Sequence, residues 1–199
     1  MKIYFIRHGF AHHNLGARLY GDAAYNLPQY KDAKLTNEGI EHAKEVGKSL
    51  SGVHFNRIYS SPSTRCIETL NHFISNNQSF NSNNKIIVLD DRLMEPQGVH
   101  ICNNRKDRIE IEKFLSEYDN KTYDLKNVSL NYNPNYESKN QTINKIVTFI
   151  DDLKKTCSND ETILVVSHYG WLNNFFEIAT GKGHAFFNCE VKIVEMKND

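Results

Sequence analysis

The sequence lacks an excess of charge of either sign, and this absence argues against several classes of protein. Lysine plus arginine total 24 of 199 residues and aspartate plus glutamate also total 24, so the formal net charge is zero. Without surplus basic residues, the composition offers no general electrostatic attraction for nucleic acid or for an anionic membrane. We therefore expect neither a nucleic-acid partner nor a membrane partner.

Long hydrophobic runs and paired cysteines are also missing. No apolar stretch approaches the roughly 18 residues that span a bilayer, and the first six residues are too few for a secretory signal. The four cysteines include no Cys-x-x-Cys pair, so they form neither a zinc-ribbon spacing nor a dense disulfide framework. We interpret them as reduced thiols and expect a cytoplasmic protein.

The length and the distribution of asparagine bear on domain organisation. A chain of 199 residues corresponds to one domain, so we expect residues 1–199 to share one core. The 24 asparagines cluster at 76–84 and 127–140, where few apolar residues can anchor a packed segment, which predicts loops. Residues 122–137 show no period, and we predict an irregular excursion over about 119–138.

Short apolar runs alternate with amphipathic stretches along the chain. The runs predict strands at residues 3–6, 55–59, 85–89, 162–167 and 186–195. The amphipathic stretches predict helices at 36–50, with Thr36 as its N-cap, and at 64–74, 106–118, 140–155 and 170–180. Such alternation is typical of an α/β fold with a mostly parallel sheet.

Chemically active side chains follow four of the predicted strands. They are Arg7 and His8, Arg65, Glu95, and His168. Ligands of an open α/β sheet bind beyond the carboxyl ends of its strands. Guanidinium groups suit phosphate oxygens, a neutral imidazole can attack phosphorus, and a glutamic acid of raised pKa can protonate a leaving oxygen. These residues therefore predict a phosphoryl pocket.

Five motifs occur in order around these residues. They read RHGFAHHN at 7–14, LTNEG at 35–39, SSPSTRCIET at 60–69, LMEP at 93–96 and VVSHYG at 165–170. The ordered set resembles the histidine phosphatase superfamily, which includes the cofactor-dependent phosphoglycerate mutases. The resemblance implies a three-layer phosphoglycerate mutase-like fold, with a mostly parallel central sheet and helices on both faces.

The resemblance also implies a catalytic role for each matching residue. His8 is the phosphorylated nucleophile and Glu95 the proton donor. Arg7 and Arg65 clamp the phosphoryl oxygens together with His168. No metal and no cofactor is expected, because the arginines and the second histidine supply the charge stabilisation that an ion supplies elsewhere.

Further residues are candidates for contact with the substrate. Asn14 matches an asparagine of the first motif, which implies a phosphate contact. EPQGVHICNNR at 95–105 resembles a stretch of fungal and plant phosphoglycerate mutase-like proteins, which makes His100, Cys102 and Arg105 candidates. The alternative is that Cys102 is a small buried residue and Arg105 a charge that flanks a helix.

Two departures from the family concern the acid motif. Met94 stands where most members have an arginine before the glutamate, and the Arg-His-Tyr-Gly run that follows the acid in mutases is absent. The second departure favours hydrolysis over mutase chemistry. The expected protein is a metal-independent phosphatase acting on a small phosphomonoester or a phosphoprotein, through a phosphohistidine at His8.

Other functions are open at this stage. The protein is alternatively a phosphoglycerate mutase, or a non-catalytic phosphate-binding or interaction protein that has kept the pocket. A metal cluster at His8, His12 and His13 is disfavoured, because no carboxylate lies nearby and Arg7 repels a cation. Ser167 lacks the flanking glycines of a serine hydrolase.

Overall fold

A computed structural model describes residues 1–80, 86–118, 121–132 and 135–197. In these ranges the strands are β1 (Lys2–Arg7), β2 (Arg57–Ser60), β3 (Ile86–Asp90), β4 (Thr122–Asn127), β5 (Thr162–Ser167) and β6 (Val191–Glu195). They form one sheet in the order β4-β3-β2-β5-β1-β6. All neighbouring pairs are parallel except β1 and β6, so the predicted mostly parallel sheet is confirmed.

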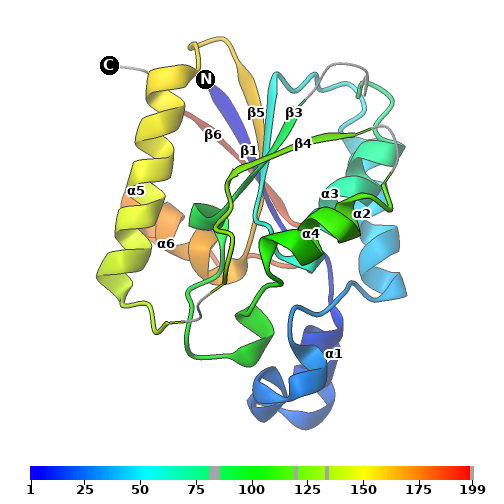
Figure 1. Cartoon of the computed structure of the whole chain (residues 1–199). Helices are drawn as coiled ribbons and strands as arrows, with labels where there is room; N and C mark the ends of the chain where they lie inside the picture. Colours follow the sequence, from blue (N-terminus) through cyan, green and yellow to red (C-terminus); the bar gives the residue numbers. More distant parts are fainter. Residues whose placement is uncertain (81–85, 119–120, 133–134, 198–199) are drawn as a thin grey trace.

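Helices cover both faces of this sheet (Figure 1). They are α1 (His12–Tyr20), α2 (Asn37–Ser49), α3 (Thr64–Asn76), α4 (Arg108–Leu115), α5 (Lys139–Thr156) and α6 (Tyr169–Thr180). Helices α5 and α6 lie on one face, and α2, α3 and α4 lie on the other. The predicted three-layer α/β fold is therefore confirmed.

The alternation of side chains along β1 explains why its sequence is continuously apolar. Tyr4 and Ile6 pack against the side of α3 and α4, whereas Ile3 and Phe5 pack against the side of α5 and α6. Successive side chains of a strand point to opposite faces, and both faces are covered here. The hydrophobic core is therefore divided by the sheet into two clusters.

Helix α2 begins where the sequence predicts, and its first turn presses on the loop after β1. The Thr36 hydroxyl accepts a hydrogen bond from the Gly39 amide at 3.1 Å, as an N-cap residue does. A Cβ atom at Gly39 would lie 2.1 Å from the carbonyl oxygen of Phe10. Glycine is therefore required at this position for α2 to approach the loop that carries His8.

The predicted excursion at 119–138 is wrong in its first part. Residues 122–127 form β4, which pairs in parallel with β3 at the edge of the sheet. The sequence of β4, TYDLKN, contains no apolar run, and only Leu125 is buried, so it did not predict a strand. An edge strand with one polar side needs no apolar run. Residues 119–120 and 133–134 of the predicted excursion lie outside the described residues.

Residues 12–34 also hold structure that the sequence did not predict. Besides α1, two short 3₁₀ helices occur there, at Asp22–Asn26 and Pro28–Tyr30. This segment lies beyond the sheet, on the side to which β1 points its carboxyl end (Figure 1). The end of the predicted asparagine-rich loop and the start of the third predicted strand, residues 81–85, lie outside the described residues.

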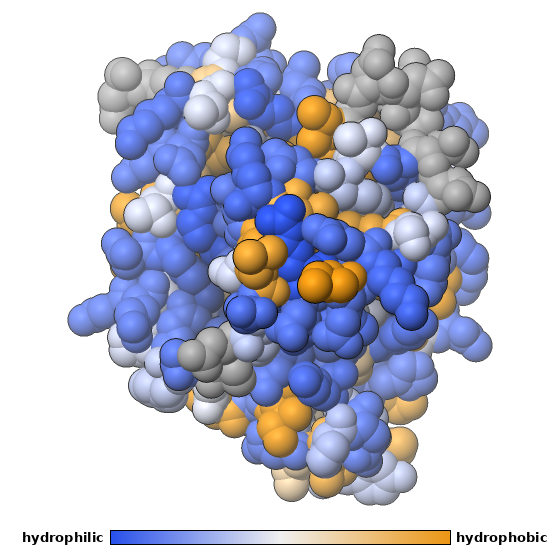
Figure 2. All heavy atoms as spheres, viewed as in Figure 1, coloured by the Kyte–Doolittle hydropathy of each residue, from blue (hydrophilic) through white to orange (hydrophobic). Residues whose placement is uncertain are grey.

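The visible surface is mostly hydrophilic. On the face shown in Figure 2, hydrophobic side chains form small separate groups among polar ones. Within the described ranges, no helix has both the length and the apolar character needed to cross a membrane.

Candidate active site

A cavity of about 400 Å³ contains four of the five predicted catalytic residues. Arg7 and His8 come from the end of β1, Arg65 from the first turn of α3, and Glu95 from the loop after β3. The remaining lining residues are His13, Asn14, Tyr25, His100, Cys102, Asn103 and Tyr169. The sheet topology thus brings these residues together at the carboxyl ends of the parallel strands, although they are far apart in the sequence.

His8 presents an unprotonated ring nitrogen. Its Nδ1 lies 2.8 Å from the carbonyl oxygen of Gly9, which only accepts, so Nδ1 carries the proton. The lone pair is therefore on Nε2, which forms no hydrogen bond with the described residues. Burial lowers the pKa of His8 well below its usual value, and Arg65 adds to this effect. The imidazole is neutral and nucleophilic at neutral pH.

Arg65 is almost entirely buried, and hydrogen bonds hold its guanidinium group in place. Its Nη1 donates to the carbonyl oxygen of Cys102 at 2.9 Å. Its Nη2 donates to Nδ1 of His168 at 3.1 Å and to Oδ1 of Asn103 at 3.2 Å. These three acceptors are uncharged, so the positive charge of the guanidinium is not neutralised by them. The charge remains available to an anion in the cavity.

Four buried side-chain nitrogens have no hydrogen-bond partner in the part of the chain that the structure describes. They are Nε of Arg7, Nε of Arg65, Nδ1 of His13 and Nδ1 of His100. All four belong to residues that line the cavity. A buried donor without an acceptor is costly, especially on a charged group. The cavity therefore suits an anion with several acceptor oxygens, and a phosphoryl group is such an anion.

His168 lies behind Arg65 and does not line the cavity. Because Nδ1 accepts from Arg65, Nε2 carries the proton and donates to the Ser61 hydroxyl at 2.8 Å. Burial lowers the pKa of His168 well below its usual value. Its ring centroid is 5.3 Å from that of His8. Both ring nitrogens of His168 are thus hydrogen-bonded within the protein, to Arg65 and to Ser61.

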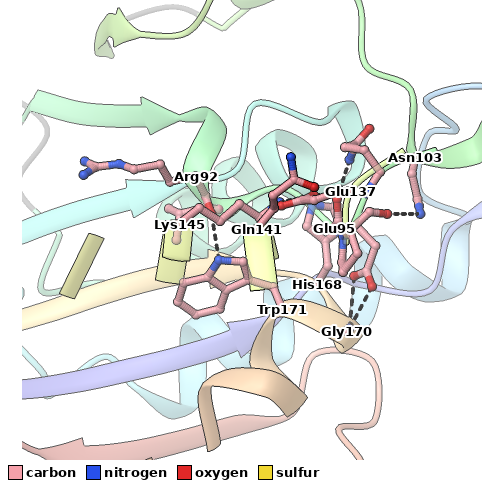
Figure 3. Close-up of polar contacts among 12 residues, drawn as sticks. Arg92, Glu95, Asn103, Glu137, Gln141, Lys145, His168, Gly170 and Trp171 are labelled. Carbon is pink, nitrogen blue, oxygen red and sulfur yellow. Dashed lines mark hydrogen bonds and ion pairs between the residues drawn. The ribbon is translucent and has the colours of Figure 1, made fainter. Parts of the chain in front are cut away.

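Glu95 is partly buried, and its carboxylate is fixed by a backbone amide. The Gly170 amide donates to Oε1 at 2.9 Å and to Oε2 at 3.1 Å (Figure 3). A Cβ atom at Gly170 would lie 2.1 Å from Oε1, so only glycine permits this contact. Burial raises the pKa of Glu95, although Arg65 opposes the shift. The carboxyl group therefore keeps its proton to higher pH than an ordinary glutamate.

The chain after β4 secures the loop that carries Glu95. The Glu137 amide donates to the carbonyl oxygen of Gln97 at 3.0 Å, and the Gln97 amide donates to Oε2 of Glu137 at 3.1 Å. Lys145 of α5 pairs with the same carboxylate at 2.7 Å (Figure 3). This part of the predicted excursion is thus attached next to the acid.

Arg105, a predicted candidate for substrate contact, does not line the cavity. Its Nε and Nη2 bind the two carboxylate oxygens of Asp91 at 2.8 and 2.9 Å, and Nη2 also donates to the carbonyl oxygen of Ser129. The side chain is fully buried. It joins the segment after β3 to the chain after β4, which is a structural role.

The other predicted contact residues lie at the cavity. Asn14, His100 and Cys102 line the cavity, and Oδ1 of Asn14 also accepts from the Ala11 amide at 3.1 Å. Met94 is buried outside the cavity, so nothing in the lining takes the place of the family's arginine at that position.

The alternative metal cluster is not assembled. His12 is exposed on α1, whereas His13 is buried and lines the cavity. In the described ranges, no three histidine, cysteine, aspartate or glutamate side chains are grouped as metal ligands.

Sequence reasoning did not single out Tyr25, Asn103 or Tyr169 as lining residues. Tyr169 follows His168 directly, so its place after a strand was a usable signal. Tyr25 lies in a 3₁₀ helix without apolar periodicity, and only its tertiary position reveals it.

Comparisons with known proteins agree with this geometry. A sequence profile of the histidine phosphatase superfamily (branch 1) matches residues 3–199. A probable phosphoglycerate mutase of Arthroderma benhamiae is 31% identical over 128 residues, which are 56% of this chain and 38% of that protein. The match therefore spans well under two thirds of that relative's length.

Solved structures share the fold. A phosphoglycerate mutase from Bacillus anthracis superposes with a TM-score of 0.67 at 18% identity, covering 100% of this chain and 88% of that one. A phosphoserine phosphatase from Entamoeba histolytica, in complex with 3-phosphoglyceric acid, gives a TM-score of 0.59 at 23% identity, covering 96% and 89%. Both similarities show a phosphoglycerate mutase-like fold.

Proposed function

Because the chain belongs to the histidine phosphatase superfamily, we propose that it hydrolyses phosphomonoesters by way of a phosphohistidine on His8. One observation carries this proposal. His8, whose Nε2 forms no hydrogen bond with the described residues, lies in the same cavity as the guanidinium groups of Arg7 and Arg65, whose Nε–H donors have no acceptor there. A nucleophile beside unsatisfied cationic donors is the arrangement that transfer of a phosphoryl group requires.

In the first step the ester is cleaved. The non-bridging oxygens of the substrate accept hydrogen bonds from the guanidinium groups of Arg7 and Arg65, which line the cavity. The lone pair of His8 Nε2 attacks phosphorus, and the bond from phosphorus to the ester oxygen breaks. Protonated Glu95 gives its proton to that oxygen, so the alcohol leaves neutral. The carbonyl oxygen of Gly9, at 2.8 Å from Nδ1, stabilises the positive ring of the phosphohistidine.

In the second step the phosphohistidine is hydrolysed. Ionised Glu95 removes a proton from water, the water oxygen bonds to phosphorus, and the bond from phosphorus to Nε2 breaks. The products are inorganic phosphate, neutral His8 and protonated Glu95. His168 takes part as a positioning residue, because it holds Arg65 through Nδ1 while Ser61 fixes its tautomer.

The proposed reaction needs no metal ion and no organic cofactor. Two permanent cations supply the charge that a metal supplies in other phosphatases, and they surround the site where the oxygens bind. Phosphoglycerate mutase is a second candidate, since the fungal relative carries that name. A mutase passes the phosphoryl group to a second hydroxyl, whereas a phosphatase passes it to water.

The proposal is tested by phosphate release from a panel of phosphomonoesters with a chelator present. We expect release from several esters, including p-nitrophenyl phosphate, at rates that the chelator does not change. Isomerisation of phosphoglycerates without release would instead show the mutase. Binding of inorganic phosphate with neither activity would show a protein that only binds phosphate.

Glu95→Gln should slow the enzyme most for esters with poor leaving groups. An alkyl phosphate needs the proton from Glu95, whereas p-nitrophenolate leaves without one. We expect roughly 100-fold or more loss in kcat/KM for an alkyl phosphate and a much smaller loss for p-nitrophenyl phosphate. Equal losses for the two esters would remove Glu95 from the role of acid.

The pH profile gives an independent check of the same residue. Alkyl phosphate cleavage requires protonated Glu95, so kcat/KM should fall as pH rises through its raised pKa. It should also fall at low pH, as His8 becomes protonated below its lowered pKa. Glu95→Gln should abolish the loss on the alkaline side and retain the loss on the acidic side.

A further inference from the structure

The part of the cavity beyond the phosphoryl position is walled by rings. The ring of Tyr25 lies between two imidazoles, with centroids 5.9 Å from His13 and 5.1 Å from His100. Tyr169 lines the same cavity, and the guanidinium of Arg7 lies 5.3 Å from the centroid of its ring. These rings come from α1, the first 3₁₀ helix, the loop after Glu95 and the start of α6.

Two groups of this wall, His13 and Tyr25, are uncharged. Burial lowers the pKa of His13 well below its usual value and raises the pKa of the Tyr25 hydroxyl, so both groups are neutral at neutral pH. Among the described lining residues, the only lysine or arginine side chains are Arg7 and Arg65. Both guanidinium groups are assigned to the phosphoryl oxygens in the proposed mechanism, and Nη1 and Nη2 of Arg65 already form hydrogen bonds within the protein.

Two lysines, Lys106 and Lys145, form ion pairs outside the cavity. Lys106 binds Asp32 at 3.0 Å and the Thr64 hydroxyl, and Lys145 binds Glu137 at 2.7 Å. Neither lines the cavity. Because both arginines of the cavity are assigned to the phosphoryl group, no further lysine or arginine among the described lining residues is left to pair with a carboxylate on the leaving group. Such a carboxylate would also lie in the same cavity as Glu95. A planar uncharged group, in contrast, finds ring faces on which to pack.

We infer that the substrate is a phosphomonoester whose leaving group carries an uncharged planar ring, packed against Tyr25 and His100, and carries no carboxylate. The inference rests on the proposed phosphatase function, because it concerns the alcohol that His8 displaces. The chemistry is shared by small phosphorylated aromatic compounds and by phosphotyrosine in a peptide. A cavity of about 400 Å³ is within the range of small-molecule sites.

The test compares esters that differ in the ring but not in the reacting oxygen. 2-Phenylethyl phosphate and propyl phosphate both release a primary alcohol, so their intrinsic reactivity is similar. We expect kcat/KM to be roughly ten-fold or more higher for 2-phenylethyl phosphate. 3-Phosphoglycerate, which adds a carboxylate without a ring, should be no better than propyl phosphate. A phosphotyrosyl peptide and p-tolyl phosphate, which has the same ring without a carboxylate, are measured against each other to distinguish a protein from a small-molecule source of the ring.

Two variants of one residue connect the preference to the wall. Tyr25 is half-buried, so its replacement is not expected to unfold the protein. Tyr25→Leu removes the ring and should reduce the ratio between the two esters to near one, whereas Tyr25→Phe keeps the ring and should keep the ratio. The turnover of propyl phosphate serves as the internal reference in each variant.

The results separate this inference from the function on which it rests. Three results would overturn the aromatic preference while leaving a phosphatase. They are equal kcat/KM for 2-phenylethyl and propyl phosphate, a ratio that Tyr25→Leu does not change, and a higher kcat/KM for 3-phosphoglycerate than for propyl phosphate. Absence of phosphate release from every ester, p-nitrophenyl phosphate included, would instead overturn the phosphatase function.

Discussion

Replacing His8 with alanine should lower phosphatase turnover by about 10⁵-fold, the scale on which removal of a covalent nucleophile acts. The reason is that the two other histidines of the cavity lie at different places from His8. The ring centroid of His13 is 5.6 Å from that of His8, and His100 lies against Tyr25, with centroids 5.1 Å apart. The measurement is phosphate release under single-turnover and steady-state conditions.

A matched control separates loss of the nucleophile from loss of the fold. His72 is a half-buried histidine of α3 that does not line the cavity, so His72→Ala should keep near-normal turnover. His8→Ala should retain its thermal stability and its binding of inorganic phosphate, because Arg7 and Arg65 are unchanged. Turnover of His8→Ala within a few-fold of the parent protein would refute the covalent mechanism.

Arg65→Gln should reduce kcat by about 10²- to 10³-fold, as does the removal of one donor that stabilises developing negative charge. The variant loses the cation that lines the cavity. It also leaves the Cys102 carbonyl and Nδ1 of His168 without their donor, so stability should fall as well. Phosphate release and urea unfolding measure the two effects separately.

Arg105→Gln is the matched control, because Arg105 is equally buried but lies outside the cavity. It should destabilise the protein by about 3 kcal/mol, since its loss leaves Asp91 unpaired at a partly buried position. Its kcat per folded molecule should stay near normal. A similar loss of kcat in both variants would show that the effect at Arg65 is structural and not electrostatic.

The sequence predicted the parts of the site that topology controls. Arg7, His8 and Glu95 follow strands, and Arg65 opens the helix after a strand, so a parallel sheet brings them to one edge. Their convergence needs only strand order and direction, which short apolar runs and strand-to-helix alternation indicate.

What the sequence did not predict depends on where individual side chains point. His168 has the expected position after β5, but its hydrogen bonds to Arg65 and Ser61 arise from three separate elements. Arg105 lies within a motif next to the acid, yet its guanidinium turns towards Asp91. No spacing along the chain encodes either direction.

Elements without strong periodicity were missed for a related reason. β4 is a polar edge strand, and α1 buries only His13 and Gly16. Such segments are stabilised by contacts with the rest of the fold, so their sequences need little apolar pattern. Tyr25, which carries the aromatic preference that we infer, lies in a segment of this kind.

The most direct test of the covalent mechanism is to trap the phosphorylated protein. The protein is mixed with p-nitrophenyl phosphate, stopped in base during turnover, digested and analysed by mass spectrometry. We expect one phosphoryl group on the peptide that contains His8, stable in base and lost in acid, and none in His8→Ala. Turnover with no phosphoryl group on His8, or with the group on another residue, would contradict the account.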